Sequence, residues 1–272
     1  MQASCCHQLR PSHACWLIPQ GLSWRRQASH QRLDHGGTAI FGLCISGGNH
    51  ALGVRRLDAI VVSHGDADHA GGFAAVQRRF AAPVVFAPQW DRVPGAAPCL
   101  AGSAWQADGV VFRFLHPDVH FPDFRNPSSC ALRVDTRHGR LLLPGDIDAV
   151  VERLLVHRDA AALQADVVVA AHHGSRSSSD PAFIDATGAR HALISAGHGN
   201  RFGHPHATVV DRWGEAGSAV LGTAAGGALR IRFDDQGPAV DAQRLRHRRL
   251  WDAAQRDARW ARSRPALSYS DD

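Results

Sequence analysis

The sequence SHGDADHAGG at residues 63–72 carries four potential metal ligands within six residues, directly after the apolar run LDAIVV at 57–62. The apolar run predicts a buried strand. Imidazole nitrogens and carboxylate oxygens suit zinc or manganese. We expect the loop to direct alternate side chains at two ions, with His64 and Asp66 facing one and Asp68 and His69 facing the other. The alternative is a polar turn whose charges are solvated.

Two later segments end predicted strands with further possible ligands. LLLPGDID at 141–148 places Asp146 after a glycine, where its carboxylate could bridge two cations. In AAHHGSRSSS at 170–179, we expect one of His172 and His173 to bind metal and its neighbour to donate to substrate or to an outer shell. Either segment alone is compatible with an ordinary turn, but next to the first motif both favour a metal site.

A glycine-rich segment, GHGNRFGHP at 197–205, mixes hydrogen-bond donors with flexible backbone. Asn200, Arg201 and His204 could contact a phosphate or an anionic leaving group. A plain surface loop is the alternative.

Strand and helix patterns alternate along the chain, which favours a layered α/β fold. Expected strands span 57–62, 83–87, 110–115, 131–135, 140–143, 166–170, 191–195, 219–221 and 228–233. Expected helices span 70–80, 148–157, 159–164, 181–187 and 206–216.

The four motifs together with NPSSCALRV at 126–134 resemble the metallo-β-lactamase superfamily, and within it the C-terminal hydrolase domain of ComEC-type DNA-uptake proteins. The resemblance runs from about residue 51 to the tail, and Asp66 stands where many members carry a histidine. It implies an αββα sandwich with two divalent cations, zinc or manganese. It also places Asn126 and Ser129 near the site, and we expect both of them, together with Ser175, to contact substrate.

The start of the chain departs from the family pattern. The family's opening strands are not recognisable before residue 51, so we expect a sandwich that lacks them and a poorly ordered segment at 1–50. A truncated or frame-shifted gene would explain this segment. The family-like domain is expected at 51–242, followed by a basic helix and tail at 243–272.

Composition adds few limits. The 272 residues carry a net charge of +5, and all 30 basic residues are arginine. Six cysteines form no zinc pattern, so we expect no disulfide framework and a packing role for Cys130. No apolar run reaches the roughly 18 residues of a membrane helix, and localisation stays open.

The resemblance to the ComEC-type domain implies a metal-dependent phosphodiesterase that acts on DNA, with single-stranded DNA as the expected partner. Asp68, His173 and His204 are the expected catalytic residues. One alternative is another hydrolase of the same fold, acting on a phosphorylcholine ester, a lactone or a thioester. The other is a non-catalytic remnant.

Overall fold

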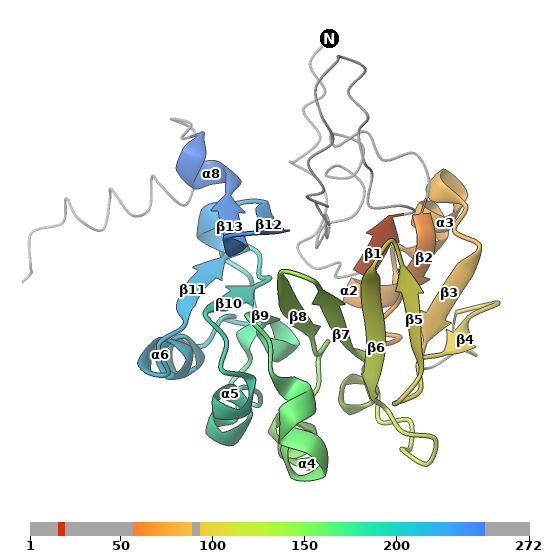
Figure 1. Cartoon of the computed structure of the whole chain (residues 1–272), viewed down its shortest axis with the longest axis horizontal. Coiled ribbons are helices and arrows are strands. Elements are labelled where there is room, and N and C mark those ends of the chain that lie inside the picture. The colour runs from red at the N-terminus through yellow and green to blue at the C-terminus, as the bar shows by residue number, and fades with distance from the viewer. Residues whose placement is uncertain (1–15, 20–56, 89–92, 248–272) are drawn as a thin grey trace, which may run out of the picture.

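The computed structural model describes residues 16–19, 57–88 and 93–247, of which only the backbone is described for 16–19 (Figure 1). The larger sheet has the order β11-β10-β9-β8-β7-β6-β5. Its strands are β5 (Ala104–Ala107), β6 (Val110–His116), β7 (Ala131–Thr136), β8 (Gly139–Leu143), β9 (Val167–Val169), β10 (His191–Ile194) and β11 (Ala219–Gly222).

A smaller sheet faces it, in the order β1-β2-β3-β4. Its strands are β1 (Trp16–Pro19), β2 (Leu57–Val61), β3 (Val84–Ala87) and β4 (Ala97–Pro98). A separate hairpin joins β12 (Leu229–Asp234) to β13 (Gly237–Ala242). The helices are α2 (Ala67–Ala70), α3 (Phe73–Phe80), α4 (Ala149–Asp159), α5 (Pro181–Thr187), α6 (Ala207–Glu215), α7 (Thr223–Gly226) and α8 (Gln243–Arg246).

Successive side chains of the central strands point to opposite faces of the larger sheet, so each strand contributes to two cores. Leu141 and Leu143 of β8 face the core shared by the sheets and the hairpin, whereas Leu142 faces the core under α4, α5 and α6. A third core packs α3 against β2 and β3. Figure 1 shows α4, α5 and α6 beside the larger sheet and α3 beside the smaller one. Helices therefore cover both outer faces, which confirms the predicted αββα sandwich.

Several details differ from the sequence prediction. The helix expected at 70–80 is interrupted at Gly71-Gly72 and becomes α2 and α3. The sequence prediction also missed four short elements, β4, β5, α7 and β13. Strand β1 pairs antiparallel with β2, with Trp16 opposite Val61, so β2 has a neighbour on that side. The rest of the predicted poorly ordered segment, and most of the predicted basic tail beyond α8, lie outside the described residues.

A disulfide joins Cys99 to Cys130, 31 residues apart in the chain, with a Cα–Cα distance of 5.8 Å. Both cysteines are buried in the core between the sheets. The structure therefore has a disulfide where no disulfide framework was expected, and Cys130, which was expected only to pack, both packs in the core and forms this bond. The spacing of the cysteines gave no signal, because the fold alone brings these two together.

Strand direction positions the site. Strands β8, β9 and β10 are parallel neighbours, so their carboxyl ends lie at one edge of the larger sheet, where sites of α/β folds are found. Ser63, the second residue after β2, lies at this edge as well, because the Cys130 backbone N–H donates to the Ser63 carbonyl at 2.8 Å. Among the helices of the described ranges, none is long and apolar enough to cross a lipid bilayer.

Candidate metal centre

Four side chains from three separate strand ends converge at this edge. Asp68 and His69 lie on α2 after β2, Asp146 follows β8, and His173 lies in the short 3₁₀ helix Ala171–Gly174 after β9. Each offers one ligand atom, and these four atoms all lie within 4.8 Å of one another. Within the described parts of the chain, this is the group of acidic and histidine side chains with metal-binding geometry.

The distances within this cluster, which we call the four-ligand cluster, fit a metal ion. The Nε2 atom of His69 lies 3.1 Å from Asp146 Oδ2 and 3.2 Å from His173 Nε2. The Nε2 atom of His173 lies 3.4 Å from Asp146 Oδ2 and 3.6 Å from Asp68 Oδ2. Ligands held tetrahedrally at metal bonds of about 2.0–2.2 Å would stand about 3.3–3.6 Å apart. The observed spacing is close to this range.

The outer contacts of the two imidazoles aim them inward. His173 Nδ1 lies 2.8 Å from the Ser195 carbonyl oxygen, which can only accept, so Nδ1 carries a hydrogen and Nε2 is the atom that can bind either a proton or a metal ion. His69 Nδ1 lies 2.7 Å from the Ser63 hydroxyl. Such outer partners are typical of metal-bound histidines.

The charges in the cluster also favour a cation. Burial lowers the pKa of His173, but its hydrogen bond with Asp68 and the charge of Asp146 outweigh burial and raise it to about 9. Burial raises the pKa of Asp146, but the nearby histidines outweigh it and hold the pKa well below its usual range. The site thus combines two carboxylates with a strong tendency to bind positive charge, here a proton on His173.

His64 and Asp66 lie beside the four-ligand cluster. His64 Nε2 is buried, has no hydrogen-bond partner and lies 3.8 Å from Asp66 Oδ2. Burial, together with the neighbouring His69, lowers the pKa of His64 to about 4, so its ring is neutral at pH 7. A buried imidazole nitrogen without a partner is costly, and a cation between His64 and Asp66 would satisfy it.

His172 points elsewhere, although it is adjacent to His173. Both have left-handed backbone angles, with φ of 50° and 55°. Non-glycine residues rarely adopt this conformation, which is concentrated at functional turns. His172 Nε2 lies 3.2 Å from Asn126 Nδ2, and its ring lies 5.9 Å from that of His204. The structure therefore brings only the second histidine of the pair into the four-ligand cluster.

The predicted substrate residues occupy different kinds of position. Ser129 is fully buried, and its hydroxyl donates to the Asn126 carbonyl and accepts from the Asp146 backbone N–H at 3.0 Å. It supports the Asp146 turn and does not face solvent, which corrects its expected contact with substrate. Asn126 borders the site through His172, and the Ser175 hydroxyl lies 3.1 Å from that of Ser177.

The loop at 197–205 is fixed largely by Asn200. Its Nδ2 donates to the Gly197 and His204 carbonyls, and its Oδ1 accepts from the His204 backbone N–H at 3.0 Å. Asn200 thus shapes the loop, while Arg201 is exposed at its tip. Burial and the nearby His172 and His173 lower the pKa of His204.

Three contributors were not identified from the sequence. The Ser63 hydroxyl and the Ser195 carbonyl orient the two imidazoles of the cluster. Arg125 donates from Nε and Nη2 to Asp66 Oδ1 at 3.1 and 2.8 Å. Ser63 is adjacent to the first motif and could have been noticed, whereas the other two contacts depend on tertiary structure.

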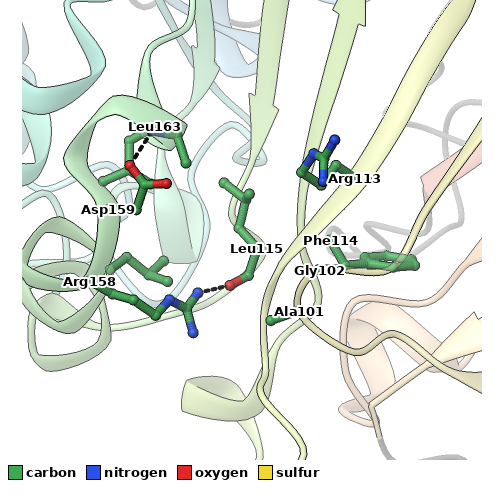
Figure 2. A pocket seen from close by; sticks show the side chains of 10 residues that line it. Ala101, Gly102, Arg113, Phe114, Leu115, Arg158, Asp159 and Leu163 are labelled. Carbon is green, nitrogen blue, oxygen red and sulfur yellow. Dashed lines mark hydrogen bonds between the residues drawn. The ribbon is translucent and has the colours of Figure 1, made fainter.

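A cavity of about 340 Å³ lies away from these ligands, between β6 and α4 (Figure 2). Its lining includes Arg113, Leu115 and Arg158, and Arg158 donates to the Leu115 carbonyl. No residue of the four-ligand cluster lines it. The metal centre is therefore not in this cavity.

Comparison with known proteins gives a consistent picture. The sequence matches the metallo-beta-lactamase superfamily over residues 33–198. It is 39% identical over 233 residues to Competence protein ComA of Neisseria gonorrhoeae, covering 85% of this chain and 33% of that protein. It is 29% identical to ComE operon protein 3 of Bacillus subtilis, covering 68% of this chain and 26% of that protein. The chain thus spans a third or less of the length of these two relatives.

Among solved structures, Igni18, a metallo hydrolase of Ignicoccus hospitalis, aligns with a TM-score of 0.48 and 11% identity, covering 81% of this chain and all of the other. The family match extends over more than half of the chain and includes the first ligand motif, Asp146 and the histidine pair. The protein belongs to the metallo-β-lactamase superfamily.

Proposed function

We propose that this protein is a metal-dependent phosphodiesterase that hydrolyses DNA, with single-stranded DNA as substrate, in a DNA-uptake process. The observation that carries the proposal is the four-ligand cluster, whose atoms lie within 4.8 Å of one another. The similarity to proteins named for competence supports DNA as the substrate.

The proposed cofactors are two cations, zinc or manganese, whose usual ligands include imidazole nitrogens and carboxylate oxygens. Asp68, His69, Asp146 and His173 would hold one, and His64 with Asp66 would contribute to the second. The ions would supply Lewis-acid chemistry, which activates water and stabilises charge on the phosphoryl oxygens.

The chain's own residues would bind and orient the phosphodiester. Arg201, exposed on its loop, and Asn126, beside His172, are the groups we propose to contact the strand around the scissile phosphate. Hydrolysis adds water across the P–O bond, so the leaving oxygen must gain a proton. We assign that transfer to His204, whose lowered pKa leaves the ring neutral at pH 7 and able to relay a proton taken from the attacking water.

The test is hydrolysis of an end-labelled single-stranded oligonucleotide with added manganese or zinc. Asp146→Asn should lower the rate by at least about a hundredfold, because loss of a ligand should exceed the 10- to 100-fold effect of losing an outer partner. Asp185→Asn, which alters an exposed carboxylate on α5, is the matched control and should cleave like wild type.

The alternatives give different results. Cleavage of a phosphorylcholine ester, lactone or thioester without cleavage of DNA would assign the same fold to another substrate class. A folded wild-type chain that binds no metal and cleaves none of these substrates would identify a non-catalytic remnant.

A further inference from the structure

Two exposed aromatic side chains belong to loops that lie beside the metal centre. Within the described residues, the large apolar side chains that are exposed include only two aromatics, Phe124 and Phe202, each 60% exposed. A single exposed apolar residue needs no explanation. The exposure of Phe124 and Phe202 does need an explanation, because both residues belong to loops that contact His172.

The loop of Phe124 reaches His172 through Asn126, whose Nδ2 lies 3.2 Å from His172 Nε2. Its backbone is fixed, because the Phe124 N–H donates to the Ser128 hydroxyl at 2.6 Å. Phe124 is therefore held on an ordered turn beside the site.

The loop of Phe202 reaches His172 through rings. The Phe202 ring is nearly parallel to that of His204, with centroids 5.9 Å apart, and His204 lies 5.9 Å from His172. The ring of His172 lies 6.4 Å from that of His173, a member of the four-ligand cluster. A short series of ring contacts thus connects Phe202 to the metal centre.

An arginine adjoins each phenylalanine. Arg125 follows Phe124 and bonds to Asp66, and Arg201 precedes Phe202, with its guanidinium 4.8 Å from the ring centroid. Proteins that bind single strands combine cationic groups for the backbone with aromatic rings on which bases stack, largely independently of sequence. Each loop thus carries an aromatic ring and an arginine, and the arginine beside Phe124 is held by Asp66.

We propose that Phe124 and Phe202 are base-stacking residues that hold unpaired bases on either side of the scissile phosphate, so that the site selects single-stranded DNA. This inference rests on the proposed function and adds the selectivity. In a duplex the bases stack on each other and their faces are not available to the two rings.

The test measures binding by fluorescence anisotropy, using a phosphorothioate strand that resists hydrolysis and a second strand of equal length made of abasic residues. Phe124→Ala and Phe202→Ala should each raise Kd for the base-carrying strand about tenfold, within the range known for base–aromatic stacking. Kd for the abasic strand should change by less than about twofold, since it offers nothing to stack. Phe202→Tyr should bind like wild type, as should Val150→Ala, which alters an exposed apolar residue on α4.

Two results would overturn the inference. Unchanged Kd of both alanine variants for the base-carrying strand would exclude stacking, and an equal loss on the abasic strand would show that the substitutions only disturb the loops. Failure of the proposed function would differ from both, because the wild type would then leave a hydrolysable strand intact with manganese and zinc.

Discussion

Glu152 links the two loops that carry Asp146 and His173, and replacing it with glutamine should change how stability depends on pH. Its side chain is completely buried on α4, whose first turn follows the Asp146 loop. Its two oxygens accept backbone N–H groups of Ser179 and Asp180 at 2.9 and 2.7 Å, in the segment that follows His173.

The size of the effect follows from its burial. Burial raises the pKa of Glu152 from 4.5 to about 7, although the two backbone N–H groups oppose the change. The folded protein therefore binds this proton more tightly than the unfolded chain. The contribution to the free energy of unfolding is fully present below pH 4.5 and is lost as the pH rises through 7. Between about pH 5 and pH 8.5 the loss should be about 2–3 kcal/mol, at about 1.4 kcal/mol per pKa unit.

The assay is urea unfolding of wild type and Glu152→Gln at both pH values, in EDTA so that metal binding does not contribute. Other titrating groups act in both proteins and cancel in the difference. The free energy of unfolding of the wild type minus that of the variant should be about 2–3 kcal/mol lower at pH 8.5 than at pH 5. Free energies that differ by the same amount at both pH values would refute the argument.

Three further predictions concern the site and its frame. Ser63→Ala removes the hydroxyl beside His69 and should weaken metal binding about 10- to 100-fold in chelator competition; unchanged affinity would contradict the orienting role. Gly145→Ala should lower stability in urea unfolding by more than about 1 kcal/mol, because φ is +67° and a Cβ there would lie 2.8 Å from a neighbouring side-chain carbon; wild-type stability would show that the turn can adjust. Cys99→Ser combined with Cys130→Ser should lower the free energy of unfolding by about 3–4 kcal/mol in urea unfolding, because the disulfide no longer closes the 31-residue loop in the unfolded chain. A reductant should destabilise the wild type but not this variant.

The layers were predictable because their strands are continuous apolar runs. Leu141–Leu143 and Val167–Val169 are buried on both faces, and such runs read as central strands of a parallel sheet. β13 was not predicted because its residues are mostly half-buried and include a glycine and a proline, which give no period-2 signal. The break between α2 and α3 is a local effect of the adjacent glycines, which the apolar pattern does not record.

The sequence could predict that the three ligand segments lie close together, because each follows a strand. It could not predict which side chains of these segments enter the site. The choice between His172 and His173 depends on two left-handed backbone conformations that no residue type announces. The burial of Ser129 and the pairing of Cys99 with Cys130 depend on how the two sheets approach each other. These are tertiary distances, and a pattern in one sequence does not contain them.

Metal content of the purified, dialysed protein, measured by mass spectrometry, tests the central claim most directly. The wild type should retain at least one equivalent of zinc or manganese, and Asp68→Ala with His69→Ala should retain none. The control, His157→Ala with Asp185→Ala, removes an exposed histidine and an exposed carboxylate outside the four-ligand cluster and should bind metal like wild type. A folded wild type with no metal, or equal metal in the wild type and the Asp68 and His69 double variant, would contradict the account.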